Sequence, residues 1–430
     1  MSSKKLLYLF DIKYPKSESW DKTKTYVEFE LNNVHYSMVN SIRRTILSKV
    51  KTVGFRTEPY EANQIKIIKN NTPLHNQLLT HRISMIPINF KKPEEYDEDE
   101  YLYSIDVTNN TNSILHITSK DFKIKRISTN KYLSNDEVNK LFPPDPITGD
   151  YLLITILKPK HYLNLSNSKL KDEIDKHIEK EVENTVSLHF EGKATVSNGS
   201  ENGHFSPVSC VAYINKVDKD LAKIKEDEYV NKQNQITQTN NLTDYPEETL
   251  RNRFNISEKS NYFHTNDKGD PNKFIFKVET LGTIPPLIIF DKAINILASS
   301  ISNFSSNLLT KNSNYIEISL SSTIKDGYDI KVFEEDDTLG NVVQCYLNEL
   351  YCDYTLPKDK KLLNYIGYKK PHPLDKMIMF TVQSIGRDID KITEDIIIPG
   401  CEIIIKTLKN IQKQLHQHKE FISEAKSLNQ

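Results

Sequence analysis

Glycine is scarce in this sequence, and the glycine-rich loops that bind phosphate are missing. Only 12 of the 430 residues are glycine, and neither GxGxxG nor GxxxxGK followed by Ser or Thr occurs. These loops are the usual means of holding a nucleotide phosphate at the N-terminus of a helix. The sequence therefore argues against nucleotide hydrolysis by this chain.

Cysteine is also sparse and scattered. The four cysteines, Cys210, Cys345, Cys352 and Cys401, include no CxxC pair. Because the cysteines are scattered, neither a disulfide framework nor a cysteine-based zinc site can be read from the sequence, and the thiols are interpreted as structural. We expect no cofactor and no stoichiometric zinc or iron.

Clusters with catalytic spacing are missing as well. The acidic run at residues 96–100 could suggest carboxylates of a two-metal site, but it has no shaping turn and no second acidic cluster. Such runs are mostly solvated loops. His416 and His418 lie two positions apart on an expected helix and do not share a face, and no Ser/His/Asp set can be assembled. We predict no catalytic residues.

The chain has no excess of charge of either sign and no long apolar run. Its 57 basic and 58 acidic residues balance, which is not the pattern of a protein that binds nucleic acid by itself. No stretch approaches about 18 uninterrupted apolar residues, and the apolar run in residues 1–10 is too short for a signal peptide. We expect an intracellular chain with protein partners and no membrane contact.

A strand followed by an amphipathic helix occurs near the start of the chain. Residues 26–31 (YVEFEL) alternate between apolar and acidic side chains, with the period of a half-buried strand. Val39, Ile42, Ile46 and Val50 then recur at three- and four-residue steps, which predicts one buried helical stripe with Arg43, Arg44 and Lys49 off that stripe.

The same order returns in the second half. Residues 315–320 and 328–333 are predicted to form a hairpin around Asp326-Gly327. A helix follows, for which Asp337 or Thr338 is a suitable N-cap. We interpret the two strand-to-helix segments as a diverged internal repeat.

Each half also ends in a long helix with a coiled-coil-like period. Pro285-Pro286 and Pro399-Gly400 suit the first turns of these helices. Each stripe could pack only on its own sheet, but two such seams in one chain favour pairing with each other. The seam residues are Ile294, Leu297, Ile301, Phe304 and Leu308 in the first helix and Ile404, Leu408, Ile411 and Leu415 in the second.

These patterns predict an α+β fold of two similar units paired through their long helices, with a mainly β lobe inserted in the first. The length and the 37% hydrophobic content suit two to three globular domains. The Asn-, Lys- and Glu-rich excursion, with possible short helices such as Leu221 to Tyr229, is interpreted as surface structure or partial disorder. The expected divisions are residues 20–90 with 205–310 for the first unit, 91–204 for the insert, 215–273 for the polar excursion, and 311–430 for the second unit.

Three short motifs follow one another in the first half: residues 40–44 (NSIRR), 71–75 (NTPLH) and 81–88 (HRISMIPI). Singly, each is also typical of a solvated helix face or a surface corner before a strand. In this order they resemble the first domain of the alpha-like RNA polymerase subunits, with its pattern NALRR, NTSVLxDE and HRLGLIPL. Residues 203–208 (GHFSPV) and 274–286 (FIFKVETLGTIPP) extend this resemblance over most of residues 20–310.

Two further motifs lie in residues 334–341 (EEDDTLGN) and 367–374 (GYKKPHPL). They resemble the EDHTLGNLL and GYKxPHPL signatures of the small partner subunit of the same polymerases, over about residues 312–420. Both partners in one chain resemble the fused platform subunit of some large DNA viruses of eukaryotes. The positions that carry this second resemblance are Asp337, Thr338, Leu339, Gly340, Asn341, Pro371, His372 and Pro373.

The sequence also departs from the pattern of these subunits. Ser84 and Met85 stand in place of Gly-Leu, and Asp337 stands in place of His. The insert lacks the cysteines that hold zinc or an iron-sulfur cluster in some relatives, so no metal is carried over. Residues 353–363 lengthen the connection after the second helix.

The resemblance implies a non-catalytic assembly platform of a DNA-directed RNA polymerase. Such a platform binds the two largest subunits and a small zinc-binding subunit, without sequence-specific contact to nucleic acid. Asn40, Arg43, Arg44, His81 and Arg82 are the expected subunit-docking residues. One copy per enzyme is expected because both halves are present, and a viral chain would occur in the virion and the host cytoplasm.

Two other functions stay open on the sequence alone. Residues 120–126 (KDFKIKR) form a basic segment that a stand-alone nucleic-acid-binding protein could use, and such binding would weaken with salt. An enzyme of unrecognised type would need convergent polar groups in a cleft, and the sequence locates none.

Overall fold

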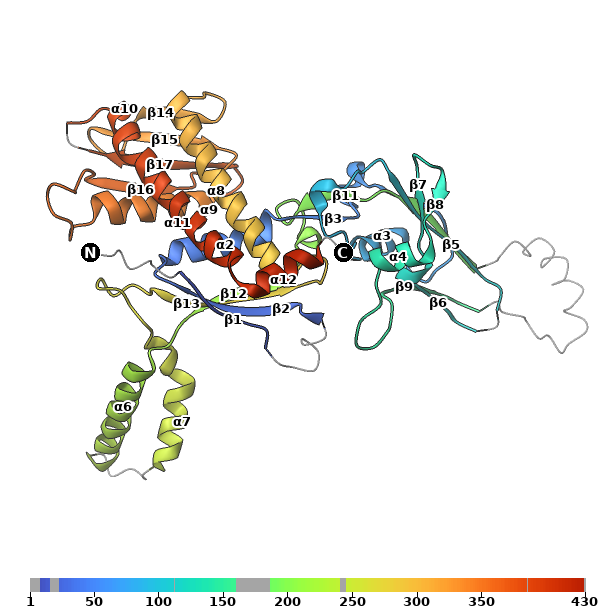
Figure 1. Ribbon diagram of the computed structural model, residues 1–430, viewed down its shortest axis with the longest axis horizontal. Coiled ribbons are helices and arrows are strands. Elements are labelled where there is room, and N and C mark those ends of the chain that lie inside the picture. Colours follow the sequence, from blue (N-terminus) through green and yellow to red (C-terminus); the bar gives the residue numbers. More distant parts are fainter. Residues whose placement is uncertain are drawn as a thin grey trace, which may run out of the picture.

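The computed structural model describes residues 8–15, 23–111, 113–159, 186–239, 245–384 and 386–428. Most of the segment weighed as a signal peptide, and residues 160–185 of the expected insert, lie outside these residues. Figure 1 shows a central body of two sheet-and-helix units, a lobe to one side, and a helical hairpin that projects away from the body. The fold is α+β, as predicted.

The first unit is a four-stranded antiparallel sheet with two helices packed on one face. In β2 the alternating residues Val27, Phe29 and Leu31 are buried, because they face these helices. The strand predicted at residues 26–31 is therefore confirmed. In sheet order the strands are β1 (Leu9–Lys13), β2 (Tyr26–Asn32), β13 (Lys273–Thr280) and β12 (Val208–Asn215), and the helices are α2 (Tyr36–Ser48) and α8 (Pro286–Thr310).

The second unit repeats this plan with a second antiparallel sheet. The predicted hairpin is present as β14 (Ile316–Leu320) and β15 (Gly327–Phe333), which pair with β17 (Met377–Gln383) and, beyond it, β16 (Tyr365–Lys369). The N-cap of its first helix is Asp336, whose side chain accepts a hydrogen bond from the Thr338 backbone, so the predicted cap at Asp337 or Thr338 was one or two residues late. The helical elements are α9 (Asp337–Leu347), the π-helical turns η6 (Asn348–Cys352) and η7 (Thr393–Ile397), α10 (Ile389–Ile392), α11 (Ile398–His416) and α12 (Lys419–Ser427).

The helices of the two units meet in one hydrophobic core. α8 packs along α11, and α2 packs against both α8 and α9 (Figure 1). Every residue of the two sequence-derived seams is buried in this core. By length and composition α8 could cross a membrane, but half of its most apolar window is buried inside the protein, as in the core helix of a soluble fold.

The lobe has a separate hydrophobic core and a five-stranded sheet. This core takes in residues from Val53 to Ile88, whereas the sequence placed the start of the insert at residue 91. Residues 76–84 form a helix, not a corner leading into a strand. The order of the strands in this sheet is β4 (Ile65–Asn70), β10 (Val186–Gly192), β5 (Tyr101–Asn109), β7 (Lys123–Arg126) and β8 (Lys131–Tyr132). Two further strand pairs are β6 (Leu115–Thr118) with β9 (Leu153–Leu157) and β3 (Lys51–Gly54) with β11 (Thr195–Asn198). The helices of the lobe are α3 (Asn76–Ser84) and α4 (Asn135–Leu141). Short 3-10 turns are η1 (Tyr60–Ala62), η2 (Pro93–Glu95), η3 (Ser119–Asp121), η4 (Gly203–Phe205) and η5 (Lys259–Asn261).

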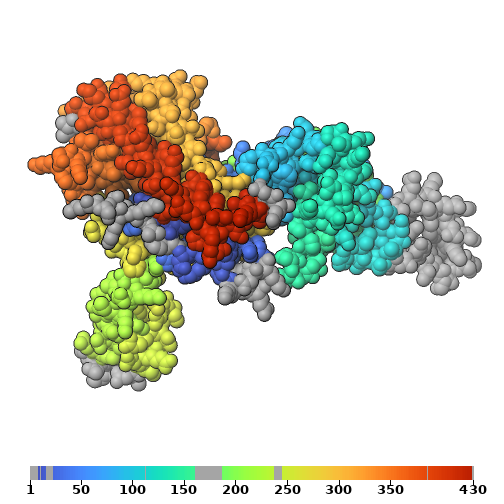
Figure 2. All heavy atoms as spheres, viewed as in Figure 1, coloured from blue at the N-terminus to red at the C-terminus, as the bar shows by residue number. Residues whose placement is uncertain are grey.

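The polar excursion is mainly a pair of helices. α6 (Lys219–Thr239) and α7 (Glu247–Ser257) lie between β12 and β13 in sequence and project away from the sheet, as Figures 1 and 2 show. The possible helix from Leu221 to Tyr229 lies within α6, so the alternative of a surface excursion with helices holds, and that of partial disorder is wrong for these two described helices. Leu250 and Phe254 are buried between them, and the Arg251 guanidinium lies 2.9 Å from the Asp227 carboxylate of the facing helix.

The lobe is attached where a turn after β11 meets the C-terminal end of α2. The Ser200 backbone N–H and hydroxyl both donate to the Ser48 carbonyl, at 2.9 and 2.8 Å. A Cβ atom at Gly199 would lie 2.1 Å from the Leu47 carbonyl oxygen, so only glycine fits without displacing the backbone.

We predict that Gly199→Ala lowers the free energy of unfolding by about 1–3 kcal/mol, the usual cost of forcing extra atoms into a packed site. Denaturant unfolding of the full chain measures this change. The matched control is Gly203→Ala in η4, where the added Cβ would meet no atom within 4 Å. Equal loss in the two variants would show that the turn is not tightly packed against α2.

Candidate subunit-docking surface

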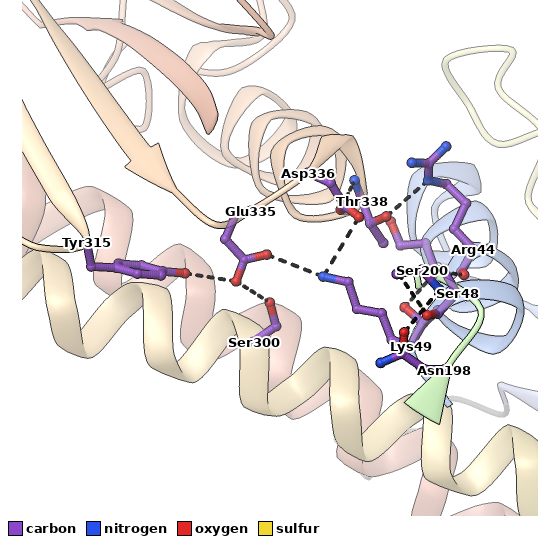
Figure 3. Close-up of polar contacts among 12 residues, drawn as sticks. Arg44, Ser48, Lys49, Asn198, Ser200, Ser300, Tyr315, Glu335, Asp336 and Thr338 are labelled. Atoms are coloured by element: carbon purple, nitrogen blue, oxygen red, sulfur yellow. Dashed lines mark hydrogen bonds and ion pairs between the residues drawn. The ribbon is translucent and has the colours of Figure 1, made fainter. Parts of the chain in front are cut away.

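The first motif of each half meets the other at the junction of α2 and α9. The Ser41 hydroxyl donates to the Thr338 carbonyl at 3.0 Å, and Arg44 Nε donates to the Thr338 hydroxyl at 3.0 Å. These partners are nearly 300 positions apart in sequence, and Figure 3 shows Arg44 facing Thr338 across the junction. The two motifs therefore form one continuous structure.

Glu335, in the turn before α9, contacts three other parts of the chain at this junction. Its carboxylate accepts hydrogen bonds from Ser300 of α8 at 3.0 Å and from Tyr315 at 2.8 Å, and it lies 3.5 Å from the Lys49 ammonium (Figure 3). Only 10% of its side chain is exposed. A nearly buried carboxylate with three partners holds α2, α8 and the second sheet in one relative orientation.

Lys49 also contacts Asp336, at 3.8 Å. Burial would raise the pKa of Asp336, but the Lys49 charge and the hydrogen bonds from Thr338 outweigh it and lower that pKa below its usual value. Lys49 is therefore a structural residue of the junction, although the sequence pattern showed only that it lies off the buried stripe of α2.

The remaining motif of the second unit, residues 367–374, packs beside this junction. A Cβ atom at Gly340 would lie 2.6 Å from the Tyr368 ring, so the glycine lets β16 approach α9 closely. The Glu334 backbone N–H donates to the Lys376 carbonyl at 2.7 Å, which ties the motif's first residue to the loop before β17. That loop exposes Pro371, His372 and Pro373, and 86% of Leu374.

The two arginines of the first motif have different surroundings. Arg43 Nη2 and Nε donate to the Asn40 side-chain oxygen at 2.9 and 3.2 Å, so Arg43 is held on the surface of α2 by its own helix. Arg44 points instead to Thr338 of the second unit. Of the two, Arg43 is the one whose described hydrogen bonds stay within the helix, and its side chain is partly exposed.

His81 and Arg82 lie in the lobe, on α3, and not at the α2–α9 junction. Both side chains are exposed, and Arg82 Nη2 donates to the Leu153 carbonyl of β9 at 3.0 Å. His81 lines an open groove of about 1280 Å3 between α3 and the segment from Thr57 to Ile67. The five expected docking residues thus fall on two elements: Asn40, Arg43 and Arg44 lie on α2, and His81 and Arg82 lie on α3 of the lobe.

The acidic run binds neighbouring strands of the lobe. Glu98 accepts hydrogen bonds from the Thr195 hydroxyl and the Val196 backbone at 2.6 and 2.8 Å, and Asp99 pairs with Lys193 at 2.7 Å. The interpretation of this run as a solvated loop is therefore wrong for Glu98, which is partly buried, whereas the Asp99 side chain is 89% exposed and is solvated despite its ion pair. Among the residues that the structure describes, no group of three or more His, Cys, Asp or Glu side chains is placed to hold a metal ion.

Sequence comparison identifies the family of the first unit and its insert. A model of the RNA polymerase Rpb3/Rpb11 dimerisation domain matches residues 28–301, which is more than half of the chain. The chain belongs to this family. The match runs from β2 through the lobe into α8, so the Rpb3/Rpb11 dimerisation domain here includes the surfaces that carry Arg43 and His81.

Curated relatives of this Rpb3/Rpb11 family chain match it in short segments. Subunit Rpo3 of the DNA-directed RNA polymerase of Pyrococcus furiosus is 31% identical over 68 residues, which are 16% of this chain and 23% of the relative. Subunit 3 of the DNA-directed RNA polymerases II, IV and V of Arabidopsis thaliana is 29% identical over 76 residues (18% and 22%). A conjugation stage-specific protein of Tetrahymena thermophila is 28% identical over 116 residues (24% and 35%). The aligned segments span between about a fifth and a third of these relatives.

Proposed function

We propose that this chain is a non-catalytic assembly platform of a DNA-directed RNA polymerase. The observation that carries the proposal is the α2–α9 junction, where the first motif of each half is hydrogen-bonded to the other in a single chain. Membership of the Rpb3/Rpb11 dimerisation domain family supports it. The platform holds the two largest polymerase subunits, which carry out RNA synthesis.

The two units take the places of two subunits that are separate in most such enzymes. This proposal is supported by their similar sheet-and-helix plan and by the core that α8 and α11 share. Fusion makes the meeting of the halves intramolecular, with an effective concentration that reaches about the millimolar range for short linkers. Assembly of the platform then depends on folding alone and not on the concentration of a second chain.

Other subunits dock on two surfaces of the platform. Arg43 on α2 and the exposed loop of residues 371–374 flank the junction and provide a guanidinium and apolar side chains to one partner. The groove lined by His81 lies on the lobe, which has its own hydrophobic core apart from the α2–α9 junction, and this separation suits a second partner. The partners are the two largest subunits and a small zinc-binding subunit.

Purification of the tagged full-length chain from cells in which its polymerase is made tests this function. We predict that both large subunits copurify and that native mass measurement finds one copy of the chain per enzyme. Two copies per enzyme, or an additional small subunit that resembles residues 312–420, would contradict the proposed fusion. Absence of polymerase subunits would contradict the platform function itself.

A further inference from the structure

The five-stranded sheet of the lobe ends in β4, which lies at one edge. Among the described strands, β4 pairs with β10 on one side and with none on the other. The backbone N–H and C=O groups along such an edge are free to pair with another strand. An extended segment of a second chain can therefore continue the sheet at β4.

The pairing with β10 determines which backbone groups of β4 point outward. The Lys193 N–H donates to the Gln64 carbonyl at 3.3 Å, so these two residues form a hydrogen-bonded pair. In an antiparallel ladder such pairs alternate with pairs that exchange no hydrogen bond. Two positions further along, Lys66 is therefore hydrogen-bonded to β10, whereas the N–H and C=O of Ile67 point away from it.

The groove of about 1280 Å3 runs along this edge of β4. Ile65, Lys66 and Ile67 all line it. Side chains of consecutive strand residues point to opposite faces of a sheet, so a groove that touches all three residues meets the strand at its edge. The outward N–H of Ile65 donates to the Asn63 side chain at 2.8 Å, and that of Ile67 is left to face the groove.

The size and charge of the groove fit an extended peptide that carries a basic side chain. Its volume exceeds the roughly 300–1,000 Å3 of small-molecule pockets. α3 forms one wall, and the loop from Thr57 to Asn63 forms the other. Glu58 and Glu61 on this loop outnumber Lys66, the lysine on the strand side, and Glu61 is exposed with no ion pair to any described residue.

We propose that the free edge of β4 takes up an extended segment of another polymerase subunit as an additional strand, with a lysine or arginine of that segment facing Glu61. His81 of the third motif lines the same groove, which makes this edge continuous with an expected docking residue. The choice of a polymerase subunit as the occupant rests on the proposed function. The hydrogen-bonding groups of Ile67 and the charge of Glu61 give the manner of recognition.

Hydrogen–deuterium exchange at residue resolution tests the strand pairing without any substitution. In the isolated chain the Ile67 amide should exchange readily, and in the assembled polymerase its exchange should slow by roughly tenfold or more. The Lys66 amide is bonded to β10 and should be protected in both states. Equal exchange of the Ile67 amide in the two states would overturn the proposal. Protection already present in the isolated chain would also overturn it, because another segment of the same chain would then cover the edge.

Ile67→Pro tests the same contact by copurification from cells that make the other polymerase subunits. Proline removes the outward N–H, and at this position of an edge strand it breaks no hydrogen bond to β10. The variant should keep its circular dichroism spectrum and lose roughly fivefold or more of at least one copurified subunit. Glu61→Lys should lower the same recovery, and more so at low salt than at high salt. Unchanged recovery with Glu61→Lys would overturn the charge pairing.

Ile318→Pro is the matched control, because β14 is an edge strand of the second sheet. The Phe333 N–H donates to the Tyr315 carbonyl, so by the same alternation Ile318 points outward. Ile318 and Ile67 are both partly buried against a core.

The β4 proposal is overturned if Ile67→Pro recovers every subunit as well as the unmodified chain does, or if Ile318→Pro loses the same subunit equally. The exchange measurement decides the matter if Ile67→Pro does not fold. Failure of the proposed function is a separate outcome, because the unmodified chain itself would then recover no polymerase subunit.

Discussion

Ile301→Asp in α8, or Leu408→Asp in α11, should abolish most of the stability of the central body. Both side chains are fully buried in the core that the two units share. Burial of each is worth roughly 1.5–3 kcal/mol, and an unpaired carboxylate in the same place adds a desolvation cost. Since native stability is typically about 5–15 kcal/mol, either change removes a large fraction of it. Thermal and denaturant unfolding measure the loss.

Exposed positions on the same two helices provide the controls for this prediction. Ser302→Asp in α8 and Ile403→Asp in α11 introduce the same carboxylate on the solvent side, where a change within about 0.5 kcal/mol is expected. If Ile301→Asp and Leu408→Asp melt like these controls, α8 and α11 do not form the stabilising seam.

Arg43→Glu should leave the isolated chain folded and weaken its capture of a large polymerase subunit. Arg43 is fixed by Asn40 on the surface of α2, and its described contacts do not reach the core. Loss of one side of a buried, charge-assisted contact between subunits typically costs about 2–5 kcal/mol. Circular dichroism measures folding, and copurification at two salt concentrations measures docking.

The structure determines which variants can serve beside Arg43→Glu. Arg44→Glu would break the hydrogen bond to Thr338, and Lys49→Glu would place a carboxylate beside Glu335, so both should destabilise the junction as well as any docking surface. Lys406→Glu in α11 is the better control, because Lys406 is exposed and has no ion pair within the described residues. Equal recovery of the large subunits with Arg43→Glu and Lys406→Glu would contradict the docking function of Arg43.

Local sequence patterns predicted the elements of the central body because its side chains alternate or recur with a clear period. Val27, Phe29 and Leu31 mark β2, and the stripes through Ile301 and Leu408 mark α8 and α11. For the polar excursion the same reasoning gave only a possible short helix from Leu221 to Tyr229, and it missed the full length of α6 and the presence of α7, because few of their side chains are buried and their surface is mostly polar. Their pairing depends on side chains such as Arg251, and a single charged residue in a sequence does not indicate which helix it will contact.

The residues that define the candidate site were only partly predictable, because their partners are distant in sequence. Glu335 belongs to a recognisable motif, but its contact with Lys49 joins positions 286 residues apart. Motif positions can therefore indicate which surface matters, whereas the contacts that stabilise that surface require the tertiary structure.

The contact between α8 and α11 has a consequence for synthesis on the ribosome. α8 ends at Thr310 and α11 at His416, so about 106 further residues must be translated before the apolar stripe of α8 can be covered. At roughly 5–20 residues per second, a nascent chain would leave that stripe exposed for about 5–20 s. Over this interval the apolar stripe of α8 is exposed to solvent on the unfinished chain. Chaperone binding, or premature association of nascent chains, would concentrate at this helix.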